Sequence, residues 1–376
     1  MKFVMSRQDL SDIVSTVQNI VAPKTPMPIL SNVLIEADED SVTVTATDLT
    51  VGVRCKKKAN VQNKGGTTLP ARRLAQLLKE LTAAHVEITS SNKDISTILS
   101  ESASFKLNGM SKVDFPSLPD LSGAVKVTIP QETLAEMFFR TSFAVSREDS
   151  RYALTGVFFS ITNGVALFAG TDGKRLARAQ LPIDIDSSVQ YECVIPAKAV
   201  DEFAKLLTKG EKPATLYLMP DKIAIDANES LILSKLLSGD FPDIDRVIPK
   251  QSTFIIQVQR EELMTLLRQV ALFISESNHS ARFTFEEGEL RLTANTADIG
   301  EGRVSMPIRY EGKRFDIAFN PSYFLDILRH CREERVTIGL QDAFNPAVIS
   351  DVAFDKQMTT APSPLYVLMP MRLSDE

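Results

Sequence analysis

The residues that could do chemistry are few and widely spaced. The chain has three histidines and three cysteines among its 376 residues. Cys55, Cys193 and Cys331 do not form a zinc-binding spacing or an even disulfide set, so we expect small buried hydrophobic residues. Acidic pairs such as Asp298 and Glu301 are typical of a solvated surface in a chain with 24% charged residues. The sequence therefore predicts no metal, no cofactor and no catalytic centre.

One segment superficially suggests a phosphate loop. Gly170-Thr171-Asp172-Gly173-Lys174-Arg175 combines two glycines with a lysine, but the glycine spacing differs from that of a P-loop. Its position at the end of a strand-like run predicts a β-turn instead. The chain contains no Gly-x-Ser-x-Gly nucleophile elbow and no His-Glu-x-x-His zinc motif. It also has no tryptophan, which disfavours a base-stacking platform for single-stranded nucleic acid.

Composition limits the class of protein and its location. A chain with 44% apolar residues is typical of a globular protein. The net charge of −6 argues against one large basic face for nucleic acid, although a modest basic surface inside an acidic shell remains compatible with it. No apolar run approaches the roughly 20 residues that span a bilayer, and the start lacks the order of a signal peptide. We expect the chain to stay in the cytoplasm.

The chain repeats one local plan six times. A short β-type run is followed by a few mostly polar residues and then by an apolar residue that opens a helical pattern. The apolar residues lie 64, 60, 66, 63 and 61 positions apart along the chain. They are Leu10, Leu74, Leu134, Val200, Leu263 and Phe324. An internal period of this kind indicates a fold built from duplicated units.

A longer period contains the shorter one. Thr45-Ala46-Thr47-Asp48, Ala169-Gly170-Thr171-Asp172 and Thr293-Ala294-Asn295-Thr296 each close a β-rich run, and they are 124 residues apart. Helical spacing occurs at 74–81 and 263–270, whereas 41–46 and 289–294 alternate with period two. Asp38-Glu39-Asp40, Asn163-Gly164 and Glu287-Gly288 provide turns.

These patterns predict an α+β fold of three repeated domains, each with two helices against antiparallel sheet. The expected domains are residues 1–123, 124–250 and 251–376, with short junctions at 116–123 and 247–251. An antiparallel sheet tolerates solvent on one face, so helices on one side would give each domain two different faces. A row of such domains could curve into an arc.

Several motifs, in order along the whole chain, are similar to those of one family. They are Met27-Pro28-Ile29-Leu30-Ser31-Asn32, Arg151-Tyr152-Ala153-Leu154-Thr155-Gly156, Thr171-Asp172-Gly173-Lys174-Arg175-Leu176, Gly239-Asp240-Phe241-Pro242-Asp243 and Tyr366-Val367-Leu368-Met369-Pro370-Met371-Arg372-Leu373. Together with the threefold repeat, they resemble the bacterial DNA polymerase III beta subunit, the replication sliding clamp. Each motif alone is weak, and the set is specific.

The resemblance implies a non-enzymatic processivity factor. Two three-domain chains would join head to tail into a ring, with helices around a central hole and sheets outside. The ring would encircle duplex DNA without sequence specificity through phosphate contacts. The matching DNA-binding positions are Lys24, Arg72, Arg73 and Lys198. Apolar residues near the expected sheet edges could form the dimer interface: Phe105 and Leu107 on one side and Phe273 and Ile274 on the other.

The resemblance also implies a hydrophobic cleft that takes short peptides of partner proteins. Expected partners are DNA polymerase III, other polymerases, an ATP-driven clamp loader and further replication and repair proteins. The matching cleft positions are Leu154, Thr171, Gly173, Arg175, Leu176, Pro242, Arg246, Val247, Val367, Leu368, Met369, Pro370, Met371 and Arg372. Arg175, Arg246 and Arg372 could orient polar atoms of a peptide. Lys174 and Ala153 depart from the family, which often has a histidine and an aromatic residue there.

Two other classes of function fit part of the pattern. An enzyme on duplicated α+β domains, acting on a phosphorylated substrate, would need converging ionisable groups. A repeat-built adaptor could bind proteins alone, without DNA. The apolar run 365–371 could also be a plain core strand at a sheet edge rather than a cleft wall.

Overall fold

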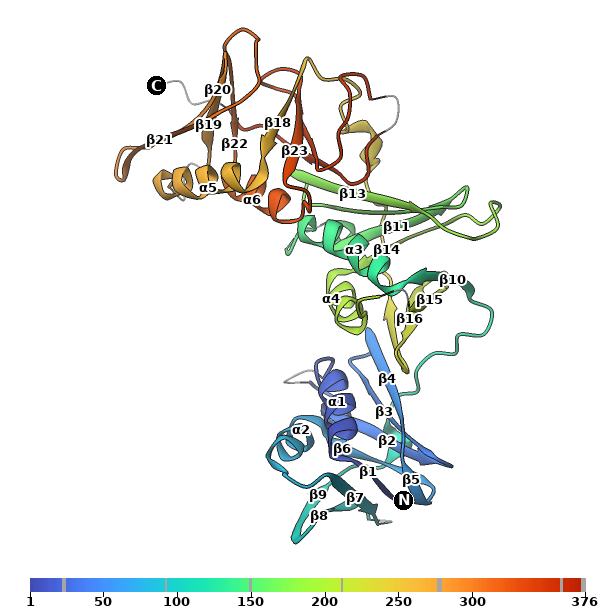
Figure 1. Cartoon of the computed structure of the whole chain (residues 1–376). Helices are drawn as coiled ribbons and strands as arrows, with labels where there is room; N and C mark the ends of the chain where they lie inside the picture. Colours follow the sequence, from blue (N-terminus) through green and yellow to red (C-terminus); the bar gives the residue numbers. More distant parts are fainter. Residues whose placement is uncertain are drawn as a thin grey trace. The chain divides into compact units, whose positions relative to one another are not determined.

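All six predicted strand-to-helix junctions are present in the fold. The structure is a computed structural model that describes residues 1–21, 25–91, 93–148, 151–210, 212–275, 279–358 and 361–372. In each junction a strand leads directly into a helix: β1 into α1, β6 into α2, β10 into α3, β14 into α4, β18 into α5 and β22 into α6 (Figure 1). The α+β class and the antiparallel sheets predicted from the sequence are confirmed.

The helices are α1 (Arg7–Gln18), α2 (Ala71–Glu80), α3 (Gln131–Thr141), α4 (Ala197–Leu206), α5 (Arg260–Val270) and α6 (Pro321–Arg329). The strands are β1 (Lys2–Ser6), β2 (Asn32–Asp38), β3 (Ser41–Thr47), β4 (Val51–Lys58), β5 (Asn60–Asn63), β6 (Gly65–Pro70), β7 (His85–Ser90), β8 (Ile95–Ser100), β9 (Ala103–Asn108), β10 (Val125–Pro130), β11 (Gly156–Thr162), β12 (Val165–Thr171), β13 (Arg175–Pro182), β14 (Tyr191–Pro196), β15 (Pro213–Leu218), β16 (Lys222–Ala227), β17 (Ser230–Lys235), β18 (Phe254–Gln259), β19 (Ala281–Glu286), β20 (Glu289–Thr296), β21 (Gly300–Pro307), β22 (Phe315–Phe319), β23 (Arg335–Leu340), β24 (Ala347–Ser350) and β25 (Leu365–Leu368). Short 3-10 turns include η4 (Tyr152–Thr155), η5 (Ile244–Arg246) and η6 (Ala271–Phe273).

All six junctions share a buried apolar anchor, and two of them also have a side-chain cap. Ser6 accepts a hydrogen bond from the amide of Asp9, and Asn320 accepts one from the amide of Ser322, so both cap helix N-termini. The six apolar anchors that define the repeat are at most 1% exposed. Full burial of such a side chain stabilises the fold by roughly 1.5–3 kcal/mol, so the sequence period is a period of core contacts.

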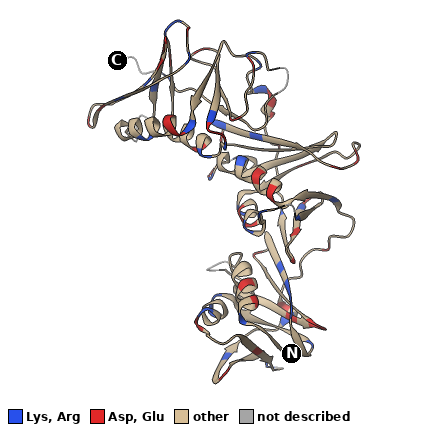
Figure 2. Ribbon diagram, in the orientation of Figure 1, with Lys and Arg blue, Asp and Glu red and all other residues tan. Residues whose placement is uncertain are grey.

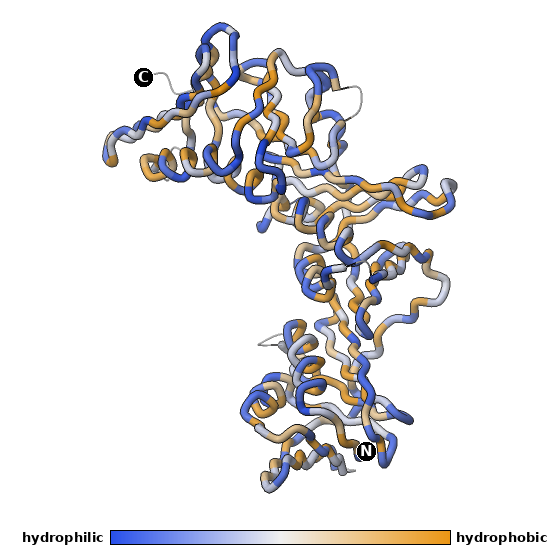
Figure 3. Tube along the Cα trace, in the orientation of Figure 1, coloured by the Kyte–Doolittle hydropathy of each residue, from blue (hydrophilic) through white to orange (hydrophobic). Residues whose placement is uncertain are grey.

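The chain divides into two compact units, of which the first comprises residues 1–134 and 201–236. It holds an eight-stranded sheet in the order β10-β15-β16-β17-β4-β3-β2-β6 and a five-stranded sheet in the order β5-β1-β7-β8-β9. The pairing of β17 with β4 joins the first repeat to part of the second, with Ile232 opposite Val53. Hydrophobic residues recur along these strands (Figure 3).

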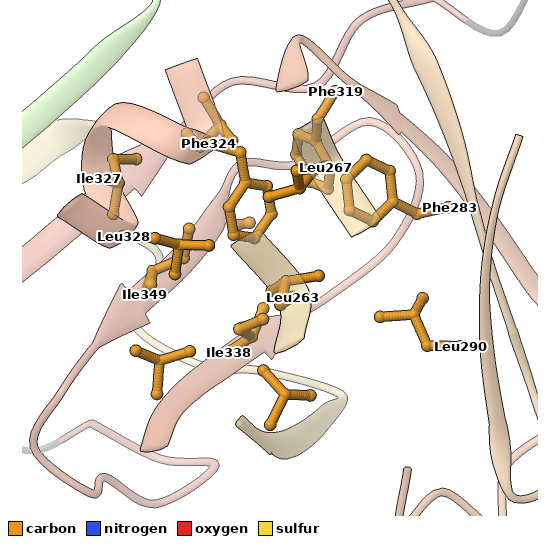
Figure 4. Close-up of a cluster of buried hydrophobic side chains, with 14 of the residues drawn as sticks. Leu263, Leu267, Phe283, Leu290, Phe319, Phe324, Ile327, Leu328, Ile338 and Ile349 are labelled. Carbon is orange, nitrogen blue, oxygen red and sulfur yellow. The ribbon is translucent and has the colours of Figure 1, made fainter. Parts of the chain in front are cut away.

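The second unit comprises residues 135–200 and 237–376. Its eight-stranded sheet has the order β14-β11-β12-β13-β25-β24-β23-β18, and its four-stranded sheet has the order β21-β20-β19-β22. A core of side chains from α5, α6 and the strands of both sheets fills the space between them, including Leu263, Phe283 and Phe324 (Figure 4). Both units take part of the expected central domain, so the boundaries at 123 and 250 stay predictions.

The three cysteines are free and buried, as the sequence predicted. Burial raises the pKa of Cys193 to about 12 and also raises the pKa of Cys55 and of Cys331. Thiols held in this state are poor nucleophiles and poor metal ligands. In the described part of the chain, no cluster of histidine, cysteine and acidic residues could hold a metal ion. None of the described helices is long and apolar enough to cross a membrane.

A buried ion pair links α3 to the C-terminal repeat inside the second unit. Arg140 donates to Asp351 across 2.7 Å, and the two side chains are 10% and 2% exposed. Burial alone would lower the pKa of Arg140, but its hydrogen bonds to Asp351 and Tyr366 outweigh burial and raise it. Removing one partner of such a pair leaves an uncompensated buried charge, which costs about 3–5 kcal/mol. The pair therefore fixes α3 against this repeat.

His330 packs beside this ion pair and introduces a pH dependence. Its ring stacks on Phe143 with centroids 3.9 Å apart, and its Nδ1 lies 2.6 Å from the carbonyl oxygen of Asp326. Burial lowers the pKa of His330. The hydrogen bond to Asp326 acts in the opposite direction, but the effect of burial is larger. The folded state thus binds this proton more weakly than the unfolded state, in which the pKa is about 6.5.

We predict that the protein loses thermal stability as the pH falls from about 7 through the lowered pKa of His330, because protonation then favours the unfolded chain. The variant His330→Phe retains the stacking on Phe143 and should show a smaller loss. Thermal melts of both proteins between pH 7.5 and 5.5 measure the difference. Equal losses in the two proteins would contradict this role of His330.

Candidate functional site

An apolar groove lies in the second unit, where β13 and β25 meet the segment that carries η5. It contains about 550 Å³ of empty space, including its open mouth. The lining residues are Arg151, Leu154, Thr171, Gly173, Arg175, Leu176, Pro242, Asp243, Ile244, Val247, Val367 and Met369. Seven of these twelve residues have apolar side chains: two leucines, two valines, an isoleucine, a proline and a methionine. The groove therefore favours an apolar ligand.

The floor of the groove is set by the pairing of β13 with β25. Leu176 lies opposite Val367 in this antiparallel ladder, so both side chains leave the same face of the sheet. They are 2% and 1% exposed and pack with Ala169, Ile244 and Leu365 in one cluster. The floor is therefore rigid, whereas Val247 and Met369 at the mouth are 45% and 40% exposed.

One wall is the turn between β12 and β13. Asp172 accepts hydrogen bonds from the amides of Lys174 and Arg175 through Oδ1, and Thr171 donates its hydroxyl to the carbonyl of Arg175. Gly173 has φ +81, a left-handed conformation that a residue with a Cβ adopts only with strain. The segment that superficially suggested a phosphate loop is thus a turn, as predicted.

Arg175 is held by several groups of the protein, and its predicted role toward a peptide stays a prediction. Its guanidinium contacts Asp172 at 3.2 Å, Asp326 at 2.6 Å and the carbonyl of Phe143 at 3.2 Å. It also lies over the ring of Tyr323, and its side chain is 10% exposed. These contacts use three of the five N–H donors of the guanidinium, so Arg175 braces the wall of the groove and also lines it.

Nine of the fourteen predicted cleft residues line the groove. They are Leu154, Thr171, Gly173, Arg175, Leu176, Pro242, Val247, Val367 and Met369. Sequence reasoning missed Arg151, Asp243 and Ile244, although Arg151 opens the motif quoted for residues 151–156 and the other two lie between predicted positions. The remaining predicted residues, Arg246, Leu368, Pro370, Met371 and Arg372, are not among the lining residues.

Leu368 is the clearest departure among these. It is fully buried and packs in the core on the other face of the sheet, with Tyr366 and Ala177. Side chains alternate across a strand, so Val367 and Leu368 cannot both face the groove. Arg246 is 84% exposed and pairs with Asp243 at 2.8 Å, and the amide of Met371 donates to the carbonyl of Ala318. The run 365–368 is an interior strand, not an edge strand.

The two departures from the family pattern lie beside this groove. Lys174 is exposed, with its Nζ 5.9 Å from the ring centroid of Tyr323. Ala153 is buried in η4 at 6% exposure, whereas the neighbouring Tyr152 is 70% exposed. Neither Lys174 nor Ala153 is among the residues that line the groove, whose floor is formed by Leu176 and Val367.

The predicted DNA-binding residues are on helices where they are described. Arg72 and Arg73 are exposed in the first turn of α2, and Lys198 is exposed in α4. Lys24 lies outside the described residues. In α2, Arg72, Arg73 and Lys79 face solvent with a single acidic residue, Glu80, which gives the helix surface a local positive charge (Figure 2).

The predicted dimer-interface residues lie at or beside sheet edges. Phe105 and Leu107 belong to β9, the edge strand of the five-stranded sheet, and Phe105 is 37% exposed. Phe273 ends η6 and packs on Gly302 of β21, which is the edge strand of the four-stranded sheet, and Ile274 follows it. Exposed strand edges are templates for pairing with another chain.

The groove combines an apolar floor with polar groups at its rim. Its described lining contains no histidine, cysteine or serine, and the hydroxyl of Thr171 donates to a backbone carbonyl. An apolar floor with a few polar groups at its rim is the pattern of a peptide-anchoring pocket.

Comparison with known proteins identifies the family. Three models of the DNA polymerase III beta subunit match in order: the N-terminal domain over residues 1–119, the central domain over 128–243 and the C-terminal domain over 245–372. The beta sliding clamp of Chlamydia pneumoniae is 49% identical over 376 residues, covering 100% of both chains. The chain belongs to the DNA polymerase III beta subunit family.

More distant relatives agree along the whole chain. The beta sliding clamp of Vibrio cholerae is 30% identical and covers 99% of this chain and 100% of its own. The crystal structure of the sliding clamp from Pseudomonas aeruginosa superposes with a TM-score of 0.93 at 29% identity, covering 99% and 100% of the two chains. The crystal structure of the sliding clamp from Bacillus subtilis superposes with a TM-score of 0.93 at 26% sequence identity, covering 100% of both chains.

These matches confirm the predicted family, the three-domain clamp fold and the function. The chain is a non-catalytic processivity factor of DNA replication, and the alternative of an enzyme on duplicated domains is wrong. The adaptor without DNA is likewise excluded by a family that acts in replication.

Proposed function

We propose that the groove anchors short peptides of replication proteins and that two copies of the chain close around duplex DNA. The observation that carries the first part is the apolar groove on the β13–β25 ladder, with a buried floor and a mouth in which Met369 is 40% exposed. Methionine is flexible and polarisable, so one groove could accept apolar side chains of different shapes. Family membership supports the second part.

The groove sets an upper limit on affinity. A peptide with a glutamine, a leucine and a terminal aromatic residue would bury two large side chains, worth at most about 3–6 kcal/mol before ordering costs. An isolated peptide should therefore bind with a Kd on the order of micromolar. Polymerase III, other polymerases, an ATP-driven clamp loader and repair proteins would share this site and compete for it.

We predict that deleting residues 369–376 abolishes binding of such a peptide while the protein remains folded. The deletion removes the Met369 wall but leaves β25 paired with both β13 and β24. The variant Met369→Ala should weaken binding about tenfold, because the shorter side chain buries less apolar surface against the peptide. Fluorescence anisotropy with a labelled peptide measures both effects.

The matched control for this prediction is Phe344→Ala, which removes an 89% exposed apolar side chain that does not line the groove. It should bind the peptide like the unaltered protein. Undiminished binding by the folded deletion variant would place the site elsewhere. Unfolding of that variant would show that residues 369–376 stabilise the core.

The ring would form by head-to-tail association of two chains. The edge strand β9, with Phe105 and Leu107, would meet β21, with Phe273 and Ile274 beside it, from the other copy. A head-to-tail contact closes into a ring only at the right rotation between copies. In each chain we propose domains over residues 1–123, 124–250 and 251–376, with the helices facing the central hole.

The DNA contacts would be electrostatic and independent of sequence. We propose Lys24, Arg72, Arg73 and Lys198 as phosphate contacts, because Arg72 and Arg73 are exposed on a helix and duplex DNA carries dense negative charge. Contacts of this kind let a closed ring slide. The proposed location is the cytoplasm, where a bacterial chromosome is replicated.

We predict that Arg72→Ala combined with Arg73→Ala weakens retention on primed DNA and flattens its salt dependence by about 0.9 in log–log slope for each phosphate that is no longer neutralised. Sequence preference should not change. The control Lys56→Ala combined with Lys58→Ala removes two exposed charges from β4, a strand, and should leave the slope unaltered. Equal slopes for the Arg72/Arg73 variant and the unaltered protein would remove α2 from the DNA contact.

A further inference from the structure

The strand β18 has an open edge. It pairs with β23 alone, at the end of its eight-stranded sheet. The amide of Arg260 donates to the carbonyl of Glu334, which sets the register of the pairing with β23. In an antiparallel pair, the N–H and C=O groups of every second residue face the partner strand. The backbone groups of Ile255 and Gln257 therefore face the open side. Within the described residues, no other segment makes a hydrogen bond to those groups.

The first repeat covers the same edge with its own chain. There β1 corresponds to β18, and the amide of Arg7 donates to the carbonyl of Ala84 as Arg260 does to Glu334. The connection between β4 and β6 contains β5, which pairs with β1 and places Asn60 opposite Val4. In the first repeat a strand of four residues thus occupies this edge.

In the third repeat the corresponding connection, residues 308–314 between β21 and β22, forms no strand. It closes on itself instead, because the hydroxyl of Tyr310 donates to the carbonyl of Lys313 across 2.7 Å. The ring of Tyr310 packs on Phe254 at 5.1 Å, and a Cβ at Gly312 would lie 2.4 Å from that ring. The connection therefore packs on the side chain of Phe254, at the start of β18, and forms no strand pairing with β18.

A basic hollow lies between this connection and the start of β18, at Phe254 and Ile255. It contains about 1100 Å³ of empty space, including its mouth. Its lining comprises four cations and one acidic residue, namely Arg309, Lys313, Arg314, Lys356 and Glu311. Arg314 is paired with Glu286 and Asp316, whereas the other three cations form no ion pair within the described residues. The floor contains the rings of Phe254, Tyr310 and Phe315.

We propose that this hollow docks a short extended peptide of a partner protein, which adds as a strand to β18. The backbone of the peptide would pair with Ile255 and Gln257, as β5 pairs with β1. Side chains of an added strand alternate between two faces. Apolar side chains would meet the aromatic floor, and acidic side chains would meet Arg309, Lys313 and Lys356. The hollow and the groove share no lining residue, so this is a second docking surface.

The open edge favours a peptide over a nucleic acid. Ile255 and Gln257 each present one N–H donor and one carbonyl acceptor along the edge. A polypeptide backbone satisfies both kinds of group in alternation, whereas a phosphodiester backbone provides acceptors only. A single-stranded oligonucleotide would use the cations and leave the carbonyl groups of β18 unpaired.

The first arm of the test uses three labelled peptides and the unaltered protein. The probe is an eight-residue peptide of alternating glutamate and valine. Its binding to the protein is measured by fluorescence anisotropy. One control has lysine in place of glutamate, and another has N-methyl groups on alternate backbone nitrogens, which removes strand pairing but keeps the charge. We expect saturable, salt-sensitive binding of the probe alone, with at least about tenfold weaker binding of both controls.

The second arm uses protein variants. Ile255→Pro removes an amide that faces the open side and leaves the bonds to β23, whereas Ile255→Val retains it. Arg309→Ala combined with Lys313→Ala should weaken probe binding about tenfold, because two positive charges are removed from the lining of the hollow. The matched charge control is Lys56→Ala combined with Lys58→Ala on β4, which should bind the probe normally. The N-methyl peptide tests the same pairing in case Ile255→Pro does not fold.

Three results would overturn the proposal. One is equal binding of the probe and the N-methyl peptide, which would mean that β18 is not the template. Another is an equal decrease of binding in the two double variants, which would indicate non-specific charge attraction. The third is tighter binding of a thymine octanucleotide than of the probe, with the same dependence on Arg309 and Lys313, which would assign the hollow to nucleic acid.

Discussion

The pairing of β13 with β25 is the interaction on which the candidate site depends. It places Leu176 opposite Val367, although 191 residues separate them in the sequence. A shift of the register by one residue would turn Val367 into the core and Leu368 into the groove. The same ladder continues one sheet from the second repeat into the third, so the groove floor is as rigid as the core beneath it.

The polar contacts around this ladder have a supporting role. Arg175 ties the β12–β13 turn to α6 through Asp326, and Arg140 ties α3 to Asp351 near the other face of the sheet. Both arginines are largely buried and bonded to carboxylates. Such pairs add little net stability when complete but are costly to break, so they specify one arrangement of the second and third repeats. These contacts also hold the wall of the proposed peptide site in place.

The repeats differ most at their sheet edges. In the first unit β5 covers β1, and β17 pairs with β4, so backbone groups that would be exposed are satisfied within the chain. The strands β9, β21 and β18 are terminal strands that pair on one side only, as is β10 of the second repeat. An open edge invites another chain, and we assign β9 and β21 to a second copy and β18 to a partner peptide. Duplication thus provides one scaffold, and local changes of edge pairing provide the contacts.

The sequence predicted local structure well and side-chain direction poorly. The common spacing of the six junctions identified Leu10 and Leu263 as residues on the buried faces of helices. The predicted turn at Asn163-Gly164 is present, with left-handed φ angles of 51° and 74°. The resemblance identified the floor residues Leu176 and Val367. It could not exclude Leu368 or show that Arg175 is occupied by Asp326, because both depend on pairings between distant segments.

The sequence also did not predict the local positive charge around Arg309 and Lys313 or the unpaired edge of β18. The connection 308–314 has nearly the same length as the one that contains β5, but it forms no strand, and its Tyr310 packs against Phe254. The net charge of −6 gave no sign of a basic hollow around Arg309 and Lys313. Such features arise from which side chains tertiary structure brings together, and the linear order of residues does not contain that information directly.

The central claim, that two copies close around DNA, is tested most directly by retention on circular and linear DNA. The protein is loaded onto nicked circular DNA with a clamp loader and ATP, then separated by gel filtration at a salt concentration that removes simple electrostatic binding. The account predicts retention on the circle, release when the circle is cut, and no retention of the variant Phe273→Ala with Ile274→Ala. Equal retention on linear and circular DNA, or release from the intact circle by salt, would contradict it.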